Sequence, residues 1–331
     1  MPSTSPLLSI ENLNTSFHTD DGVIRAVRGI DLQIHQGETI AIVGESGCGK
    51  SVTALSVLRL ISMPPGRHDS GQVKFKNINL LSLSENEMQK IRGNDISMIF
   101  QEPMTSLNPI FTVGDQISEA IIHHQKITPK EARKQTIDLL NKVSIPSPDI
   151  RINQYPHELS GGMKQRIMIA MAIACSPSLL IADEPTTALD TTIQAQILSL
   201  LSSISQETAM SILLITHNLG IVAQVADRVA VMYAGKIVEQ ATVEDIFTNP
   251  MHPYTRGLLN SIPKDDNDGS KLEPIKGSVP HPSDLPQGCA FHPRCDENMP
   301  RCQKQPNMIS LTNDTEHQIA CWLYDDSVEE H

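Results

Sequence analysis

The residue pattern with the clearest chemistry is a glycine-rich loop near the N-terminus. It reads G-x-x-x-x-G-K-S and comprises Gly44, Glu45, Ser46, Gly47, Cys48, Gly49, Lys50 and Ser51. Such a loop turns its backbone N–H groups inward, and a helix beginning at its end adds the positive end of its dipole, about half an elementary charge. The lysine can reach the β- and γ-phosphates, and the serine hydroxyl can ligate Mg²⁺. We therefore expect a nucleoside triphosphate site.

The sequence around this loop supports that interpretation. The apolar run Thr39–Val43 precedes the loop, and a stretch compatible with a helix, Val52–Ile61, follows it. A phosphate loop needs a strand before it and a helix after it. A chance glycine-rich turn, the alternative, would need neither.

Two carboxylates follow another buried-looking strand. Asp183 and Glu184 come directly after the apolar run Leu179–Ala182. In a triphosphate site, the first could hold Mg²⁺ and the second could act as general base toward the attacking water. Two acids after a strand can also form an ordinary solvated loop, but a phosphate loop in the same chain favours the catalytic role.

A second glycine-containing segment is predicted to begin a helix. Ser160, Gly161 and Gly162 lead into a helical pattern that continues to Cys175. Serine is a favoured helix cap, and a helix N-terminus attracts anions. We expect this segment to receive phosphate, with a plain helix cap as the alternative.

Apolar segments alternate with helical patterns over most of the chain, which predicts a layered α/β fold with a buried sheet. The expected strands are Thr39–Val43, Ile96–Phe100, Leu179–Ala182, Ile212–Ile215 and Val229–Tyr233. Two amphipathic helices, Val113–His124 and Pro129–Val143, indicate a helical insertion in this core. A polar segment at 263–270 is predicted to be a linker to a small C-terminal module.

Composition limits the possible function classes. The 331 residues carry a formal net charge of -12, which weighs against binding nucleic acid through a dominant basic surface. The longest wholly apolar run, Ile167–Cys175, is too short to cross a bilayer. The N-terminus lacks the features of a secretory signal, so we expect a cytosolic protein.

The segment Leu159–Met163 resembles the signature sequence of ATP-binding cassette (ABC) proteins. That resemblance implies a P-loop NTPase with a RecA-like core, an antiparallel β subdomain and a helical subdomain. It also implies roles for four further residues. Gln101 resembles the glutamine that touches Mg²⁺ and water, His217 the switch histidine, Asp190 the D-loop aspartate, and Phe17 the aromatic that stacks on adenine.

Two segments resemble the oligopeptide/dipeptide importers within this family: Gln101–Pro109, and His252–Thr255 followed by two leucines. The resemblance implies a cassette at 7–262, with its helical subdomain at about 104–156, and a C-terminal extension at 263–331. It implies a head-to-tail heterodimer with a second, homologous ATPase subunit that sandwiches two ATP molecules with Mg²⁺. The further partners implied are two transmembrane permeases and an external peptide-binding protein. The chain would then lie peripherally on the cytoplasmic face of the inner membrane.

Four cysteines lie in the proline-rich C-terminal part: Cys289, Cys295, Cys302 and Cys321. Zinc ribbons generally use close C-x2-C pairs, which this spacing lacks, so the residues favour an iron–sulfur cluster or no metal. The tail resembles the extension of peptide-importer ATPases, some of which carry a [4Fe–4S] cluster. Zinc and reduced free thiols remain open alternatives.

Two other functions deserve a test. One is a soluble ABC-type ATPase that acts on nucleic acid or ribosomes, although such chains commonly carry two cassettes or a long coiled coil. The other is a metal-binding regulator with an inactive cassette. The leading hypothesis is the ATP-hydrolysing subunit of a peptide importer.

Overall fold

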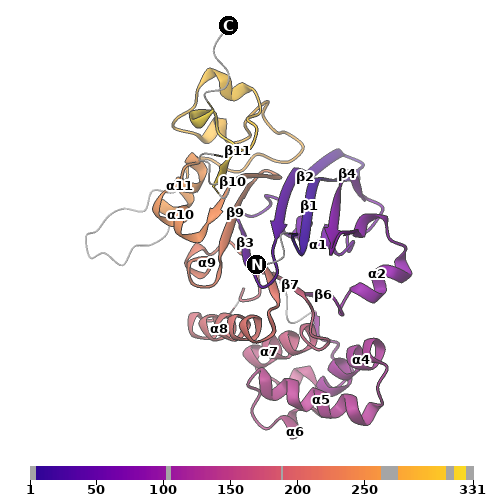
Figure 1. The fold of residues 1–331 in the computed structure, drawn as a ribbon. Helices are drawn as coiled ribbons and strands as arrows, with labels where there is room; N and C mark the ends of the chain where they lie inside the picture. The colour runs from indigo at the N-terminus through magenta and orange to yellow at the C-terminus, as the bar shows by residue number, and fades with distance from the viewer. Residues whose placement is uncertain (1–4, 102–105, 188, 262–274, 311–316, 326–331) are drawn as a thin grey trace, which may run out of the picture. The chain divides into compact units, whose positions relative to one another are not determined.

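A computed structural model describes residues 5–101, 106–187, 189–261, 275–310 and 317–325. The chain forms two compact units (Figure 1). The first contains residues 1–34, 39–81 and 216–331, and the second contains residues 35–38 and 82–215. The first unit is therefore assembled from the two ends of the chain.

An antiparallel sheet of four strands, in the order β2-β1-β4-β5, forms one layer of the first unit. Its strands are β1 (Leu8–Thr19), β2 (Gly22–Ile34), β4 (Gly66–Phe75) and β5 (Ile78–Asn79). Strand β1 pairs with both β2 and β4, and its register shifts along both ladders. Such irregularities strengthen the twist of the sheet.

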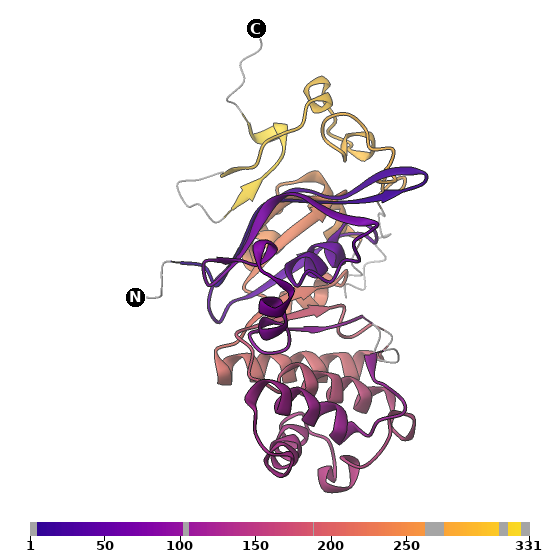
Figure 2. The same ribbon diagram turned by 90° about the vertical axis from the view of Figure 1, so that its right-hand side faces the viewer.

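A second set of strands in this unit follows the order β11-β12-β10-β9-β3. They are β3 (Thr39–Val43), β9 (Arg228–Tyr233), β10 (Lys236–Thr242), β11 (Ile309–Ser310) and β12 (Gln318–Ile319). All five residues of β3 are buried, as expected for a parallel strand covered on both faces. The C-terminal strand β12 pairs with β10 on one side and with β11 on the other. The two C-terminal strands, coloured yellow, lie side by side in Figure 2.

The first unit also contains helices. They are α1 (Lys50–Val57), α9 (Leu219–Val225), α10 (Val243–Thr248) and α11 (Pro253–Asn260). Short 3₁₀ turns at His292–Arg294, Pro300–Gln303 and Trp322–Tyr324 build the C-terminal part. Because β12 pairs with β10, this part is hydrogen-bonded to the cassette strands.

The second unit combines three parallel strands with helices. The strands run β8-β7-β6, with β6 (Ile96–Ile99), β7 (Leu179–Asp183) and β8 (Ser211–Ile215). The longer helices are α4 (Val113–Gln125), α5 (Pro129–Lys142), α7 (Gly161–Ala172) and α8 (Thr191–Thr208). The shorter helical segments are α2 (Glu85–Ile91), α6 (Pro148–Arg151) and a 3₁₀ turn at Pro156–Glu158.

Both helices predicted in the insertion are confirmed. Each begins at a capping box in which a threonine and the acid three residues later exchange hydrogen bonds: Thr112 with Asp115, and Thr128 with Glu131. These caps fix the starts of α4 and α5. The described part of the chain contains no helix long and apolar enough to cross a membrane.

The five predicted strands are present, and each end lies within one residue of the prediction. The helix predicted at Val52–Ile61 is displaced, because α1 begins at Lys50 and ends at Val57. Arg59 adopts a left-handed backbone conformation, with φ 52°, which no helix can continue. Residues 102–105, at the start of the predicted helical subdomain, and the linker at 263–270 lie outside the described residues.

Candidate nucleotide site

The phosphate loop connects β3 to α1 in the first unit, as predicted. Gly44 has a φ of 152°, and a Cβ there would lie 2.2 Å from the carbonyl oxygen of Met232. Gly49 has a φ of 107°, and its Cβ would lie 2.4 Å from the carbonyl oxygen of Ala26. Neither position accepts a side chain, so the path of the loop requires both glycines.

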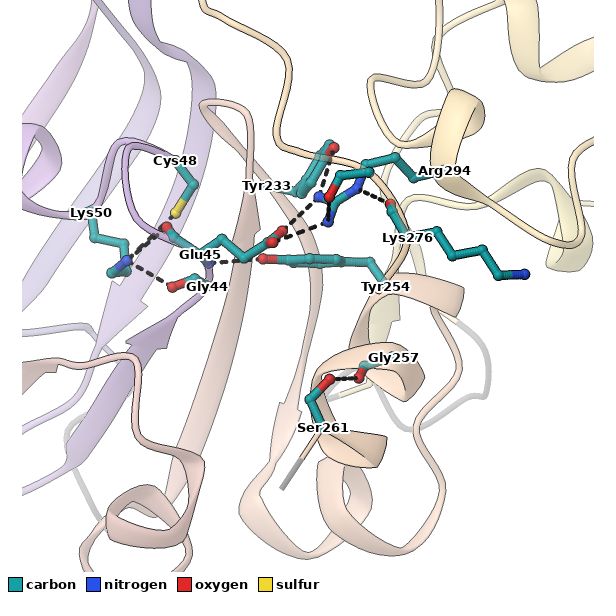
Figure 3. A network of polar contacts seen from close by, with 11 residues as sticks. Gly44, Glu45, Cys48, Lys50, Tyr233, Tyr254, Gly257, Ser261, Lys276 and Arg294 are labelled. Atoms are coloured by element: carbon teal, nitrogen blue, oxygen red, sulfur yellow. Dashed lines mark hydrogen bonds and ion pairs between the residues drawn. The ribbon is translucent and has the colours of Figure 1, made fainter. Parts of the chain in front are cut away.

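Lys50 lies inside the loop (Figure 3). Its Nζ donates hydrogen bonds to the carbonyl oxygens of Gly44, at 2.8 Å, and Glu45, at 3.0 Å. The sulfur of Cys48 lies 3.8 Å from the same nitrogen. Burial raises the pKa of the Cys48 thiol against the opposing effect of Lys50, so a neutral thiol packs beside the cation. The ammonium group of Lys50 is thus held at the phosphate loop by hydrogen bonds to loop carbonyl oxygens.

Glu45 is fixed by residues far away in the sequence. Its backbone N–H donates to the hydroxyl of Tyr254 at 2.8 Å. Its carboxylate forms an ion pair with Arg294, whose two terminal nitrogens lie 2.7 and 3.0 Å from the two carboxylate oxygens. All three residues belong to the first unit.

In the second unit, the predicted general base, Glu184, accepts hydrogen bonds from Gln101 and Thr187. The Nε2 of Gln101 donates to the Oε2 of Glu184 at 3.1 Å, and the hydroxyl of Thr187 donates to the same oxygen at 2.8 Å. Asp183 is buried at the end of β7. Glu184 itself has a φ of 47°, a strained conformation that is typical of functional sites.

The predicted anion-receiving helix start is also present in the second unit. Ser160 caps α7 by accepting the backbone N–H of Met163 on its hydroxyl, and Gly161 and Gly162 form the first turn. Asp190 caps α8 in the same way, through the N–H of Ile193 at 2.9 Å. Asp190, which resembles the D-loop aspartate, therefore also acts as the N-cap of α8.

The remaining predicted residues lie in the first unit. Phe17 is half-buried on β1, and the exposed His217 follows Thr216 just before α9. Ser51 follows Lys50 in the first turn of α1. Of the D-loop, Ala188 lies outside the described residues. The structure thus places one predicted set in the first unit and the other, comprising Gln101, Ser160–Gly162, Asp183, Glu184 and Asp190, in the second.

The four C-terminal cysteines line one cavity. Its walls are otherwise mainly apolar and include Phe291, Met299 and Trp322. The enclosed space, together with the solvent at its mouth, amounts to about 320 Å³. Burial raises the pKa of the Cys289, Cys295 and Cys321 thiols, to about 11 for Cys321, and the neighbouring cysteines raise it further. The described residues contain no group of three or more His, Cys, Asp or Glu side chains arranged as a metal site.

His252 is also one of the residues that line this cavity. Its Nδ1 accepts the backbone N–H of Tyr254 at 3.0 Å, so the ring proton lies on Nε2. That Nε2 is buried and has no partner among the described residues. Burial, with a smaller effect of Arg256, lowers the pKa of His252 to about 3, which keeps the ring neutral. A buried N–H donor beside four thiols is complementary to sulfur acceptors.

Sequence reasoning missed Tyr254, Arg294 and His252 as contributors to these sites. The segment His252–Thr255 resembles the peptide-importer group, but that resemblance gives its residues no physical role. Nothing in the sequence near Arg294 indicates that it pairs with a residue 249 positions away. The sequence offers one weak signal, which is that Arg294 directly precedes Cys295.

Comparisons with known proteins decide the family. Residues 27–187 match the ABC transporter family, and residues 238–302 match the C-terminal region of oligopeptide/dipeptide transporters. The dipeptide transport ATP-binding protein DppD of Bacillus subtilis is 53% identical, over 98% of this chain and 96% of its own. The chain belongs to the ATP-binding proteins of the oligopeptide/dipeptide ABC transporters.

Two further comparisons support this membership. The oligopeptide transport ATP-binding protein AppD of Bacillus subtilis is 52% identical, over 97% of this chain and 98% of its own. Among solved structures, the dimeric ATP-binding cassette MJ0796, in a post-hydrolysis state with ADP and phosphate, matches with a TM-score of 0.64. It is 26% identical and covers 71% of this chain and 98% of its own. The predicted ABC cassette fold is confirmed.

Proposed function

We propose that this peptide-transporter ATP-binding protein hydrolyses ATP to drive import of dipeptides or oligopeptides through partner permeases. The observation that carries the proposal is the phosphate loop, in which Lys50 donates hydrogen bonds to two loop carbonyl oxygens. The chain that contains this loop is about half identical to peptide transport ATP-binding proteins over nearly its whole length. The alternative of an ATPase acting on nucleic acid gains no support from these comparisons.

The residues divide the chemistry between them. Gly44, Glu45, Ser46, Gly47, Cys48, Gly49 and Lys50 would wrap the phosphates, Phe17 would stack on adenine, and Ser51, Gln101 and Asp183 would hold Mg²⁺. Glu184 would take a proton from the attacking water, and His217 would contact the γ-phosphate. The hydrogen bonds from Gln101 and Thr187 support this role for Glu184, because they fix the orientation of its carboxylate.

A second subunit would complete each site. The capped start of α7, at Ser160, Gly161 and Gly162, offers helix N–H groups to an anion. We infer that it closes on ATP bound by a homologous subunit, in a head-to-tail heterodimer in which Asp190 joins the two sites. ATP binding would draw the subunits together and hydrolysis would release them.

The assembly would act as a translocase with two transmembrane permeases and an external peptide-binding protein. Exposed apolar side chains in the second unit, Ile110, Phe111 and Ile150, could contribute to contact with a permease. The chain would then be peripheral, on the cytoplasmic face of the inner membrane. The transported peptide would not touch this subunit.

The cysteine cavity would hold a [4Fe–4S] cluster bound by Cys289, Cys295, Cys302 and Cys321. Two observations support this proposal: all four thiols line one cavity, and the buried Nε2 of His252, another residue of its lining, has no hydrogen-bond partner within the described part of the chain. Thiolates are the usual ligands of such clusters, and hydrogen bonds to their sulfurs tune them. A cluster would supply a cross-link between the segments that carry the cysteines.

Replacing Glu184 by Gln in the assembled transporter tests the proposed chemistry. Gln keeps the shape but cannot accept the proton, so we expect hydrolysis by this subunit to fall by at least about a hundredfold while Mg·ATP still binds. Glu207→Gln, on the exposed face of α8, is the matched control and should behave as wild type. Unchanged hydrolysis in Glu184→Gln would contradict the assigned base.

The transport function needs a separate experiment. Purification of the chain from its native membrane should recover two permeases and a second ATPase subunit, and vesicles containing this assembly should take up peptide only with ATP. Recovery with nucleic acid and no membrane partner would refute peptide import.

A further inference from the structure

The start of the phosphate loop is anchored by the C-terminal part of the same unit. Figure 3 shows Glu45 with its loop neighbours Gly44, Cys48 and Lys50 on one side and Tyr254 and Arg294 on the other. We propose that Tyr254 and Arg294 are positioning residues that hold the phosphate loop in its nucleotide-binding conformation. This proposal rests on the proposed ATP-binding function and extends it to residues outside the nucleotide motifs.

The guanidinium of Arg294 uses all its hydrogen-bond donors around Glu45 and its neighbours. It makes five hydrogen bonds, which equals its number of N–H donors. Two go to the Glu45 carboxylate, and the others go to the hydroxyl of Tyr233 and the carbonyl oxygens of Lys276 and Gly277. The side chain is only 6% exposed. A bidentate pair of this kind fixes both position and orientation.

Charge supports the same interpretation. Arginine stays protonated in proteins, and both terminal nitrogens of Arg294 contact the Glu45 carboxylate, at 2.7 and 3.0 Å. The guanidinium is therefore permanently charged, and the Glu45 carboxylate that it neutralises lies at the loop that must accept a polyanion. Without Arg294, that carboxylate would repel phosphate.

Tyr254 anchors the backbone at the same residue. Its ring is completely buried, with ring centroids 4.6 Å from Tyr233 and 5.3 Å from Phe291. Burial raises the pKa of Tyr254, so the hydroxyl stays neutral and accepts the N–H of Glu45. The hydrogen bond uses an amide at the start of the loop and leaves the amides near the start of α1 for phosphate.

Both anchors adjoin the cysteine cavity along the chain. Arg294 directly precedes Cys295, and Tyr254 lies two residues after the cavity-lining His252. The 3₁₀ turn at His292–Arg294 is itself held by a hydrogen bond from the His292 N–H to the carbonyl oxygen of Cys289. The turn that ends at Arg294 is therefore hydrogen-bonded to a cavity-lining residue.

The test uses the assembled transporter and photolabelling with Mg·azido-ATP, so that nucleotide bound to this chain is read separately from the partner subunit. Arg294→Gln should raise the half-saturating concentration about tenfold, because it removes a partly buried ion pair. Tyr254→Phe keeps the ring and should raise it about threefold, as expected for one lost hydrogen bond. Lys276→Gln is the control, because its exposed Nζ forms its ion pair with the exposed Asp296.

A double-mutant cycle distinguishes positioning from general destabilisation. In a Glu45→Gln background, Arg294→Gln should add less than about twofold, because its partner is already neutral. KM for ATP should rise in Arg294→Gln while kcat changes less than about twofold. Equal labelling of wild type and Arg294→Gln, or an undiminished effect in the Glu45→Gln background, would overturn the proposal. If wild type itself is not labelled, the proposed ATP-binding function fails instead.

Discussion

At the scale of single residues, the phosphate-loop motif, whose pattern is local, was predictable from the sequence. Gly44 and Gly49 occur where a Cβ would collide with a backbone carbonyl oxygen, which is why the motif requires glycine at both positions. Tyr254 and Arg294 were not predictable, because they contact Glu45 across 209 and 249 residues. Only the folded chain brings such partners together.

One half-buried histidine, His68, connects the antiparallel sheet to the helix of the phosphate loop. The Nδ1 of His68 lies 3.2 Å from the hydroxyl oxygen of Thr15, and that hydroxyl lies 3.1 Å from the hydroxyl oxygen of Ser56 on α1. Burial, assisted by Arg59 and opposed by Asp69, lowers the pKa of His68. The folded protein therefore favours neutral His68.

We expect this histidine to make stability depend on pH. Below the ordinary histidine pKa of about 6.5, the unfolded chain binds a proton that the folded chain resists, so stability falls as pH drops below that value. Urea unfolding at pH 7.5 and 5.5 should show a smaller loss in His68→Gln than in wild type. An equal loss in both proteins would show that His68 titrates normally.

At the scale of elements, the strands predicted from the sequence are wholly or mostly buried, whereas the missed strands β2 and β4 are not. Residues of β3, β7 and β8 are buried throughout, so each forms a continuous apolar run. Strands β2 and β4 mix buried and exposed positions without strict alternation, and β1 pairs with both through shifted register. Irregular pairing erases the period of two on which strand prediction depends.

The start of α7 allows the cap and the proposed nucleotide role of Ser160 to be separated. Ser160→Ala should lose about 1 kcal/mol of stability through the cap and nearly all ATP hydrolysis, because the helix would no longer close on the partner's ATP. Thr128→Ala removes a comparable cap from α5 and should lose similar stability with normal hydrolysis. Urea unfolding and ATPase assays on the assembled transporter provide the comparison. Equal losses of ATPase activity in both variants would show that Ser160 acts only as the cap of α7.

At the scale of the whole molecule, the layered α/β class and the helical insertion were predictable from alternating apolar and helical patterns. The assembly of the first unit from both ends of the chain was not. Strand β12 has two residues, too few for a recognisable pattern, yet it pairs with β10. The boundary between residues 262 and 263 remains a prediction. The described C-terminal residues are hydrogen-bonded to the preceding part of the chain through the pairing of β12 with β10.

The C-terminal part also carries the proposed cluster, which chemical analysis can test. Protein purified without oxygen should contain about four iron and four sulfide per chain, and Cys302→Ala should lose both. Cys48→Ala is the control, because Cys48 lies in the phosphate loop and should leave the iron content unchanged. One equivalent of zinc without iron, or neither metal, would refute the cluster.

The central claim is that the phosphate loop of this chain binds Mg·ATP. Calorimetric titration of the assembled transporter with Mg·ATP, using wild type and Lys50→Met, tests it most directly, because Lys50 is the cation held at the loop. We predict that Lys50→Met binds one ATP fewer per copy of this chain, with the partner subunit still occupied. An unchanged stoichiometry, or no uptake by the wild-type assembly, would contradict the account.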